Sequence, residues 1–593
     1  MRPSLKILGL SFFYHDSAAA LIIDGKVVAA AQEERFTRRK HDDSFPHQAI
    51  NFCLRFAGLD VSDLDYVVFY EKPILKFERL LNMYITTWPK GLRSFIQAMR
   101  VWFRDKLWIE HKIRKASGFQ GKILYTEHHY AHAASAYYCS DFDEAAIVTI
   151  DGVGEWDTTT FGYGRGNQLK LTSTIHFPHS LGMLYSALTY YLGFKVNSAE
   201  NKVMGLAPYG QPDNYLPHFR KLITIHDDGS YRLDMSYFAY TYGLTMTNRK
   251  FHNLFGSPPR QPETTLTQRH KDIAAALQKT TEKAIMKIVA QAQREFPSQN
   301  LCLAGGVALN CVANGKILSS GLYKNIYIQP AAGDAGGAVG AALYVYYAGL
   351  SQARQKSVMA NAFLGNAYGN QEIKKFLDSG TRKLTGGQSI NYQELTEQQL
   401  ISKVALLLND NKIIGWFQGR MEFGPRALGA RSIIADARVA DNWKKVNLKI
   451  KFRESFRPFA PTVLLEETNR YFELNTPTPY MLIVAKVKRH DIPAVTHVDN
   501  SARVQTVAKD DNPRFYQLLK EFYRQSGCPV IINTSFNIRG EPIVESPKDA
   551  FNCFLSTQMD CLVLGNFIIT KNENQHLASQ NQLQKYRQRF SID

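Results

Sequence analysis

The segment EHHYAHAASAYY contains histidines at a spacing that could bind a metal ion. His128 and His132 are four residues apart, so on a helix they share one face and can hold the same ion. The alanine-rich stretch AHAASA favours that helix, and His129 lies off the shared face. For this motif alone, the alternative is a helix whose histidines have this spacing by chance.

Two aspartates could complete such a site. Asp151 follows the apolar strand pattern AAIVTI, and Asp334 lies in GDAGG after the strand pattern IYIQP. A carboxylate directly after a buried strand, among glycines, is well placed for a ligand-binding crevice. Two imidazoles with one or two carboxylates suit Fe²⁺, with zinc or manganese as alternatives. Either aspartate alone could be a turn former, so the prediction rests on the combination.

Glycine-rich turns in the same half of the chain could receive a nucleotide. Such turns follow three predicted strands and contain Gly152/Gly154, Gly305/Gly306 and Gly333/Gly336/Gly337. A glycine turn that opens a helix lets the backbone approach a phosphate or ribose and presents free N–H groups. The sequence has no GxxxxGK[ST] motif, so it does not predict a P-loop nucleotide site.

Positive charge is dense near the start of the C-terminal third. The chain has a net charge of +18, which favours anionic partners, and residues 415–458 carry ten Lys/Arg against four Asp/Glu. Many of these basic residues lie beside Gly or Pro rather than on a regular helix face. Such a cluster can hold a polyphosphate or carbamoyl phosphate, with Arg503, Ser535 and Arg539 as further donors. An ordinary solvated surface is the alternative.

Residues 72–115 combine eleven basic residues with aromatic ones. Aromatic platforms beside positive charge can bind single-stranded nucleic acid, and basic amphipathic helices can lie on anionic membranes. The commoner outcome is an amphipathic helical pair that packs its aromatic side chains inward. We expect that pair here.

The strand and helix patterns predict an α/β protein of two lobes. Strand patterns at 5–11, 18–24 and 26–34 surround an Asp24-Gly25 hairpin turn, and residues 145–173 repeat this layout weakly. Helical patterns cover 45–57 and 270–294, and the region from residue 392 onward has strands and helices of its own. We expect an N-terminal domain, a linker, a C-terminal domain and a polar tail at residues 1–355, 356–375, 376–575 and 576–593.

Composition limits the class of protein. Hydrophobic residues make up 45% and charged residues 21%, which excludes disorder as the main state. No apolar run has the length of a membrane span, and the N-terminus does not have the pattern of a signal peptide. Seven widely spaced cysteines without a CxxC pair favour a reducing compartment, so we expect a cytoplasmic protein. Peripheral contact with a membrane and the oligomeric state stay open.

Nine motifs, in this order over nearly the whole chain, resemble those of one family, the O-carbamoyltransferases of the nodulation and antibiotic-tailoring type. The motifs are HDSAAALIIDG, EERFTRRKH, HHYAHAASAYY, DGVGEWDTTT, NKVMGLAPYG, GGVALN, GDAGGAVGAAL, GRMEFGPRALG and NTSFNIRGEPIV. The resemblance implies an actin-like N-terminal lobe of two duplicated subdomains, of the tRNA-threonylcarbamoyl transferase kind. It also implies a YrdC-like α/β C-terminal lobe, similar to the bacterial enzyme that makes threonylcarbamoyl adenylate.

The resemblance further implies a reaction at two sites. The C-terminal lobe would use ATP, with Mg²⁺, and carbamoyl phosphate to make carbamoyl adenylate. The N-terminal lobe would transfer the carbamoyl group to a hydroxyl of the acceptor. By motif position, the iron ligands are His128, His132, Asp151 and Asp334. The adenylate-holding residues are Lys40, Asp151, Gly152, Gly154, Glu155, Gly306 and Asn310. The ATP and carbamoyl phosphate contacts are Arg426, Lys451, Arg457, Arg503 and Ser535.

His15 is the candidate for binding or deprotonating the acceptor hydroxyl, and a histidine that caps its own turn is the alternative. We expect a small molecule or a glycan as the acceptor, rather than nucleic acid. One departure from the family pattern is Asn201, where the family would have glycine, and it could alter the acceptor pocket. Two alternatives remain: a tRNA-threonylcarbamoylating enzyme, and an actin- or chaperone-like ATP-driven interaction module.

Overall fold

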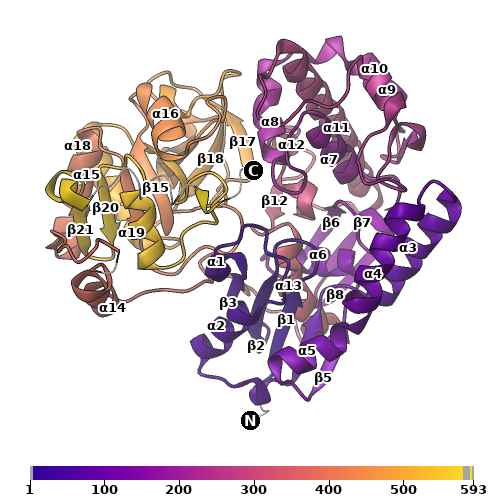
Figure 1. Ribbon diagram of the computed structural model, residues 1–593, viewed down its shortest axis with the longest axis horizontal. Helices are drawn as coiled ribbons and strands as arrows, with labels where there is room; N and C mark the ends of the chain where they lie inside the picture. Colours follow the sequence, from indigo (N-terminus) through magenta and orange to yellow (C-terminus); the bar gives the residue numbers. More distant parts are fainter. Residues whose placement is uncertain (1–3, 383, 578–585, 587, 591–593) are drawn as a thin grey trace. The chain divides into compact units, whose positions relative to one another are not determined.

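The computed structural model describes residues 4–382, 384–577, 586 and 588–590, and the chain divides into two compact units (Figure 1). Unit 1 comprises Met1–Glu33 and His41–Met359, and unit 2 comprises Glu34–Lys40 and Ala360–Asp593. The division after Met359 falls within the segment 356–375 that the sequence assigns to a linker. The sequence patterns did not predict that Glu34–Lys40 packs with the second unit.

Unit 1 contains two sheets that repeat one layout (Figure 1). The strand orders are β3-β2-β1-β4-β5 and β8-β7-β6-β11-β12. In each sheet three consecutive strands form an antiparallel meander, and two later strands continue the sheet in parallel from the first. The repeat that the two hairpin patterns predicted is therefore present.

The strands of unit 1 follow the apolar patterns of the sequence closely. In the first sheet they are β1 (Lys6–Ser11), β2 (Ala18–Ile23), β3 (Lys26–Gln32), β4 (Tyr66–Phe69) and β5 (Lys122–Tyr125). In the second they are β6 (Glu144–Ile150), β7 (Asp157–Arg165), β8 (Gln168–His176), β11 (Asn300–Ala304) and β12 (Asn325–Ile328). The predicted turn is confirmed, because Asp24 and Gly25 both have positive φ, at 47° and 81°, as a tight hairpin turn requires.

Two central helices connect the halves of unit 1. Helix α6 (His128–Tyr137) packs on β6 and β11 of the second sheet, while α13 (Asp334–Tyr344) packs on β1 and β2 of the first. The two helices also pack against each other. Their approach is very close, since a Cβ atom added to Gly340 of α13 would lie 1.8 Å from the carbonyl oxygen of Ala131 in α6. Glycine at this position therefore sets the distance between the helices.

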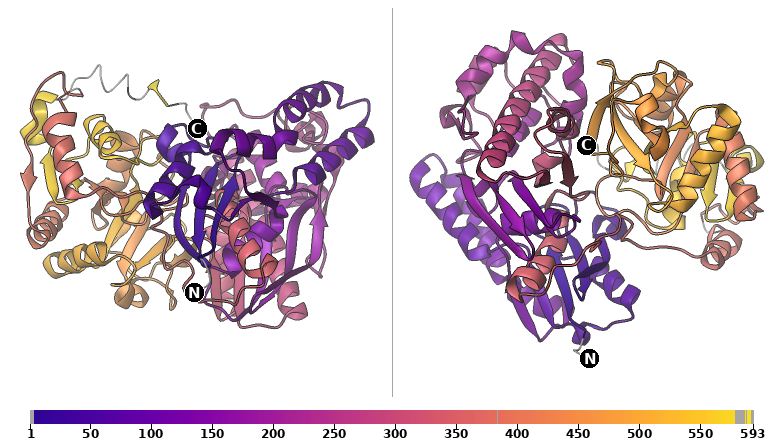
Figure 2. Two further views of the ribbon diagram at one scale, coloured as in Figure 1. Left: turned by 90° about the horizontal axis from the view of Figure 1, so that it is seen from below. Right: turned by 180° about the vertical axis from the view of Figure 1, so that it is seen from behind.

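The other helices of unit 1 lie around the sheets, and α7–α12 gather on one side of the second sheet (Figures 1 and 2). Helix α2 spans His47–Ala57. The group on the second sheet comprises α7 (Leu181–Tyr191), α8 (Glu200–Leu206), α9 (Leu216–Leu222), α10 (Arg249–Phe255), α11 (Gln268–Glu295) and α12 (Cys311–Ser319). A small hairpin is formed by β9 (Ile223–Ile225) and β10 (Tyr231–Leu233). The predicted helices at 45–57 and 270–294 correspond to α2 and α11. Asn201 lies inside α8, so its backbone does not need the left-handed angles of glycine.

The predicted basic, aromatic helical pair is present as α3 (Pro73–Thr87) and α4 (Leu92–Arg104), followed by α5 (Ile109–Ser117). The expectation of inward packing is correct only in part. Phe77 packs on Trp102 and Tyr84 packs on Phe95, with ring centroids 5.4 and 5.2 Å apart. The side chains of three other aromatic residues are exposed, namely Trp88, Phe103 and Trp108.

Unit 2 is built on one mixed sheet with the order β13-β21-β20-β14-β15-β19-β16-β18-β17. Its strands are β13 (Gln393–Glu394), β14 (Ile414–Phe417), β15 (Arg431–Asp436), β16 (Ala460–Leu464), β17 (Ile483–Lys486), β18 (Ser501–Val507), β19 (Val530–Ser535), β20 (Cys561–Leu564) and β21 (Phe567–Thr570). Its helices are α1 (Glu34–Thr37), α14 (Asn370–Lys375), α15 (Glu397–Asn409), α16 (Asp441–Lys445), α17 (Thr468–Tyr471), α18 (Pro513–Ser526) and α19 (Pro547–Leu555). The α/β class predicted from the sequence is therefore confirmed in both units.

Most of the predicted polar tail, residues 576–593, lies outside the described residues. Tyr586 is an exception to the expectation of a loosely held tail. It is buried, and its hydroxyl donates a hydrogen bond of 2.5 Å to Glu541. None of the helices in the described ranges combines the length and apolar character needed to span a bilayer.

The Gly340 contact yields a stability prediction. Gly340→Ala should lower the free energy of unfolding by about 1–3 kcal/mol, because the added methyl group must force α13 away from α6. Urea unfolding followed by circular dichroism measures this change. Gly349→Ala is the matched control, since its added methyl group would meet no atom closer than 3.9 Å. Equal stability of the two variants would show that the α6–α13 contact is not tight.

Candidate functional site

Four predicted residues converge in unit 1. One donor atom from each lies within 4.8 Å of the donor atoms of the other three, and the residues are His128, His132, Asp151 and Asp334. The Nε2 atoms of the two histidines are 3.0 Å apart. Oδ2 of Asp151 lies 3.1 Å from Nε2 of His128, and Oδ1 of Asp334 lies 3.7 Å from Nε2 of His132. These side chains are referred to below as the His–Asp cluster.

Three elements position the cluster. The two histidines occupy the first two turns of α6, Asp151 follows β6, and Asp334 is the first residue of α13. Gly306 lies after β11, and its backbone N–H donates a 2.7 Å hydrogen bond to Oδ1 of Asp151. The preceding Gly305 has a φ of 89°, and a Cβ atom there would lie 2.3 Å from the carbonyl oxygen of Ile150. Glycine is therefore needed where this turn meets Asp151.

The electrostatics of the cluster favour bound positive charge. Burial disfavours the charged ring of His128, but its hydrogen bond to Asp151 and the nearby Asp334 outweigh burial and raise its pKa to about 9. Burial also opposes ionisation of Asp151, yet the hydrogen bond to His128 keeps the pKa of this carboxyl well below its usual range. Two imidazole nitrogens and two carboxylates form a donor set that fits a divalent transition metal such as Fe²⁺, zinc or manganese.

His129 is separate from this cluster, as its position on the helix predicted. Its ring nitrogens contact Oγ1 of Thr149 at 2.6 Å and the carbonyl oxygen of Asp157 at 2.9 Å. Burial lowers the pKa of His129 to about 3, so the ring is neutral at physiological pH. Its role in the fold is to connect α6 to the β6–β7 hairpin.

Two residues that contact the cluster were not identified from the sequence, namely Tyr70 and Glu71. Tyr70 donates a hydrogen bond of 3.3 Å to Oδ2 of Asp334. Glu71 is buried, lies 3.8 Å from Nδ1 of His128 and forms a 2.6 Å ion pair with Lys76. Both residues directly follow β4, so the signal that identified Asp151, an acidic residue just after an apolar strand, was also present for Glu71.

His15 lies beside the cluster, in the turn between β1 and β2. Its Nε2 atom is 3.9 Å from Oδ2 of Asp334, and its Nδ1 atom is 3.2 Å from Asp16. Its side chain is 33% exposed, in contrast to the buried histidines of α6. Burial disfavours its charged form, but Asp334 and Asp16 prevail and raise its pKa to about 10.

Most of the predicted adenylate-holding residues border the cluster. Gly152 and Gly154 belong to the turn after β6, next to Asp151. The Glu155 carboxylate accepts backbone N–H bonds from His128 and Lys72, so it fixes the starts of α6 and α3. Asn310 caps α12, because its Oδ1 accepts a 3.1 Å bond from the N–H of Ala313, and its side chain pairs with Gln278.

Lys40 differs from the other predicted adenylate-holding residues because it belongs to unit 2. It ends the segment Glu34–Lys40, which belongs to unit 2. In that segment Arg38 forms a 2.9 Å ion pair with the buried Glu541 and donates a 2.7 Å bond to the carbonyl oxygen of Ile543. These contacts fix the segment that carries Lys40 in unit 2.

Four of the predicted phosphate contacts of unit 2 belong to one cationic region that is buried at Lys451, namely Lys451, Arg457, Arg503 and Ser535. The Lys451 ammonium is 2.6 Å from the carbonyl oxygen of Ser535 and 3.1 Å from its hydroxyl, and it also contacts Asn537. Burial, reinforced by the charges of Arg453 and Arg457, holds the pKa of Lys451 well below its usual range. Like charges gathered in this way favour a bound anion, which would restore the stability of the charged forms.

Arg453 connects the remaining members of this region. Burial together with the charge of Arg457 lowers its pKa well below the usual range, and Arg503 on β18 contributes in the same direction. Arg426 lies in the loop between β14 and β15, and β15 pairs Ser432 with Ser535. Arg453 and Asn537 were not identified from the sequence, although Arg453 lies inside the basic segment 415–458.

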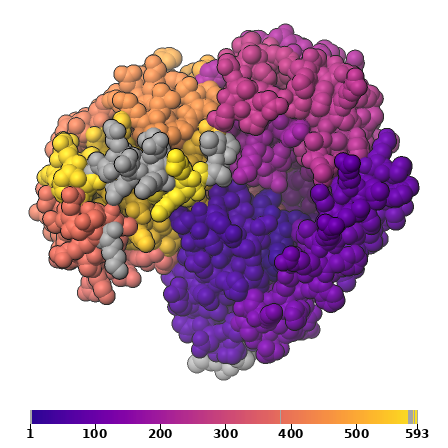
Figure 3. Space-filling view, in the orientation of Figure 1, coloured from indigo at the N-terminus to yellow at the C-terminus, as the bar shows by residue number. Residues whose placement is uncertain are grey.

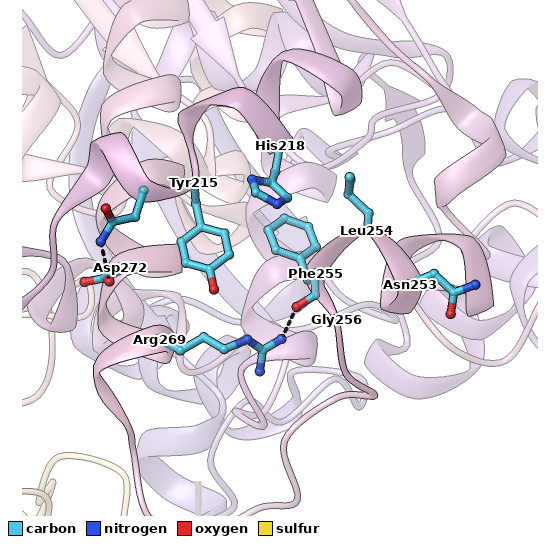
Figure 4. Close-up of a pocket in the computed structure, with 9 residues that line it drawn as sticks. Tyr215, His218, Asn253, Leu254, Phe255, Gly256, Arg269 and Asp272 are labelled. Atoms are coloured by element: carbon cyan, nitrogen blue, oxygen red, sulfur yellow. Dashed lines mark hydrogen bonds between the residues drawn. The ribbon is translucent and has the colours of Figure 1, made fainter.

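Unit 1 also contains a pocket that is lined by residues outside the predicted site (Figure 4). Its cavity of 490 Å³ is lined by Asn214, Tyr215, His218, Asn253, Leu254, Phe255, Gly256, Arg269 and Asp272. None of the predicted site residues is among them. Several of its polar groups bond to each other, since Asn214 donates to Asp272 at 2.9 Å and Arg269 donates to the carbonyl oxygen of Phe255 at 2.5 Å.

Comparison with known proteins identifies the family. Residues 6–343 match the family model for the N-terminus of carbamoyltransferases, and residues 405–571 match the model for their C-terminus. An uncharacterized protein from Synechocystis sp. is 52% identical over 621 residues, which cover 99% of this chain and 100% of that protein.

Two named relatives are more distant. The nodulation protein NolNO from Sinorhizobium fredii is 36% identical, over 94% of this chain and 79% of that protein. The 3'-hydroxymethylcephem-O-carbamoyltransferase from Amycolatopsis lactamdurans is 31% identical, over 50% of this chain and 53% of that protein. The family resemblance found in the nine sequence motifs is confirmed. The chain belongs to the carbamoyltransferase family and is a carbamoyl-transferring enzyme.

Proposed function

We propose that this enzyme is an ATP-dependent O-carbamoyltransferase with one half-reaction in each unit. In unit 2, carbamoyl phosphate loses its phosphate to water, and the carbamate formed displaces pyrophosphate from ATP to give carbamoyl adenylate. In unit 1, an acceptor hydroxyl attacks the carbamoyl carbon, and AMP leaves with the electron pair of the broken bond. The convergence of four metal-ligand side chains within 4.8 Å carries this proposal.

The His–Asp cluster would hold Fe²⁺ or another divalent transition metal. When bound, such an ion acts as a Lewis acid towards the carbamoyl carbonyl. The chain's own residues prepare this site: Gly306 and Tyr70 donate hydrogen bonds to the Asp151 and Asp334 carboxylates, and Glu155 fixes the start of α6. The ligands are thereby held in place before any substrate arrives.

We propose that the Gly152–Glu155 turn, Gly306 and Asn310 border the bound adenylate. Gly152 and Gly154 carry no side chains, so a nucleotide can come close to the backbone next to Asp151. Lys40 is proposed as an adenylate contact by its motif position alone. This assignment follows the order of the motifs, and the position of the Gly152–Glu155 turn and of Gly306 beside the cluster supports it.

The partly exposed His15 is the proposed contact of the acceptor hydroxyl. With a pKa near 10 its ring is protonated at pH 7 and can donate a hydrogen bond to the acceptor oxygen. A cation held by Asp334 would offset the carboxylate charge that raises this pKa and would favour the neutral ring, which can accept the hydroxyl proton.

In unit 2 we propose that Arg426, Lys451, Arg457, Arg503 and Ser535 bind the phosphates of ATP, with its Mg²⁺, and carbamoyl phosphate. The buried cationic region supports this role, because two multiply charged anions must be held together for the adenylate to form. The lobe would work in the manner of YrdC-like enzymes that make a related adenylate.

The acceptor is proposed to be a hydroxylated small molecule or a glycan. The Amycolatopsis relative is named as an O-carbamoyltransferase, which supports transfer to oxygen. Incubation with ATP, carbamoyl phosphate and a panel of acceptors, followed by mass spectrometry, should detect the mass gain of one carbamoyl group. A gain on tRNA alone would favour the tRNA-modifying alternative, whereas family membership gives no support to a non-enzymatic ATP-driven module.

Separate half-reactions predict separable variants. His128→Ala should reduce carbamoyl transfer by roughly 10³-fold or more while pyrophosphate release continues, because it removes a metal ligand from unit 1 only. Arg426→Ala should reduce pyrophosphate release and, with it, transfer. Arg489→Ala, which removes a surface arginine of unit 2, is the matched control. Loss of both activities in folded His128→Ala would contradict the division of labour.

Metal content is the second prediction of this site. The purified protein should hold one transition-metal ion per chain by mass spectrometry, and His132→Ala should weaken its retention against a chelator by at least ~100-fold, since a ligand is lost. His111→Ala removes an exposed histidine of unit 1 and should retain the ion. Equal metal content in the two variants would exclude the His–Asp cluster as the site.

A further inference from the structure

Helices α3 and α4 carry an apolar surface that the reaction does not use. Of the thirteen large hydrophobic side chains that are exposed in the described ranges, eight lie between residues 74 and 108. They are Ile74, Ile85, Trp88, Leu92, Ile96, Val101, Phe103 and Trp108. These residues are called the α3–α4 surface, and Figure 3 shows these helices at the edge of unit 1.

Exposure on this surface is large, and on each helix most of the exposed apolar side chains share one face, while Val101 lies on the opposite face of α4. Ile74 and Ile85 are 76% and 72% exposed on α3, and Trp88 is 65% exposed in the turn that follows. On α4, Leu92, Ile96 and Phe103 recur at intervals of four and seven residues, so they form one stripe along the helix. Monomeric proteins rarely leave such a contiguous apolar patch in water unless it binds something.

The α3–α4 surface belongs to a helical hairpin that is packed on itself and bonded to the rest of unit 1. The opposite side of the hairpin packs Phe77 on Trp102 and Tyr84 on Phe95. The Ser94 hydroxyl of α4 donates a 2.7 Å hydrogen bond to the carbonyl oxygen of Tyr242 in the body of unit 1. Of the exposed side chains, Phe103 also contacts Phe77, with ring centroids 5.8 Å apart. The exposed aliphatic side chains take no part in these ring contacts.

Charge identifies the kind of partner. Residues 72–115 contain eleven Lys/Arg against three Asp/Glu, and residues 88–104 contain Lys90, Arg93, Arg100 and Arg104 with no acidic residue. The three arginines are exposed and lie along α4 beside its apolar stripe. The partner must therefore offer both apolar volume and negative charge. A second copy of a chain with a net charge of +18 fits this requirement poorly.

The types of the exposed side chains distinguish between the two remaining anionic partners, which are single-stranded nucleic acid and an anionic membrane. Single-stranded nucleic acid needs aromatic faces on which its bases can stack. Five of the eight residues here are aliphatic, namely Ile74, Ile85, Leu92, Ile96 and Val101. Aliphatic side chains with interfacial tryptophans and flanking arginines are the features of helices that lie in the headgroup layer of a membrane.

We propose that the α3–α4 surface docks this enzyme on an anionic lipid bilayer. The apolar stripe of α4, with Ile74, Ile85 and Trp88, enters the boundary between headgroups and acyl chains. Arg93, Arg100 and Arg104 contact the lipid phosphates. The docking does not depend on the proposed reaction, and the His–Asp cluster contributes no residue to this surface.

Sedimentation with lipid vesicles tests the proposal on the full-length protein. The protein should bind vesicles of mixed phosphatidylglycerol and phosphatidylcholine, and bind pure phosphatidylcholine at least ~10-fold less tightly, because the anionic lipid attracts the arginines. Arg93→Gln, Arg100→Gln and Arg104→Gln together should lower affinity for the anionic vesicles by about 100-fold. Ile96→Ser with Phe103→Ser should lower it by at least ~10-fold.

The matched control removes three exposed charges elsewhere in unit 1, by Arg220→Gln, Lys221→Gln and Arg249→Gln. It should leave vesicle binding unchanged, and all variants should retain the wild-type melting temperature and activity on a soluble acceptor. Absence of binding to anionic vesicles, or an equal loss in the control, would overturn the proposal. A dimer in solution that the Ile96/Phe103 variant dissolves would also overturn it, by assigning the surface to a second copy.

Discussion

Two carboxylates and two imidazoles held together in the interior of unit 1 are the constraint on which its architecture depends. Asp151 and Asp334 are both buried, and burying such charges without a compensating partner is costly. Asp334 is brought to the two histidines by the contact between α6 and α13, which is so close that only glycine fits at position 340. Asp151 reaches them from the end of β6, where the Gly306 N–H holds its carboxylate. Helix α6 packs on the second sheet and α13 on the first, so the arrangement of the two repeated sheets also determines the position of the site.

Unit 2 has the opposite electrostatic character. Lys451, Arg453 and Arg457 lie close together, and burial with these like charges disfavours the charged forms of Lys451 and Arg453, which a bound anion would favour. Unit 1 thus gathers side chains of the kinds that hold a cation, and unit 2 gathers side chains of the kinds that hold phosphates. This difference is the physical basis of our proposal that the adenylate-forming step and the transfer step take place in different units.

Local sequence signals predicted the elements well. Apolar runs that end in glycine-rich turns located β6, β11 and β12, and the i, i+4 spacing located both histidines of the cluster. Long-range packing was not predictable in this way. Arg38 reaches Glu541, more than five hundred positions away, and that contact draws Glu34–Lys40 into unit 2. The exposure of Trp88 and Phe103 was missed for a similar reason, because an amphipathic pattern does not reveal which side of a helix lacks a partner.

Crystallography with anomalous scattering at a metal absorption edge tests the central claim most directly. Crystals grown with Mn²⁺ or Fe²⁺ should show one strong peak among the His–Asp cluster, about 2.0–2.2 Å from the imidazole nitrogens and carboxylate oxygens. A peak at other residues, or none at this cluster in metal-saturated crystals, would contradict the account.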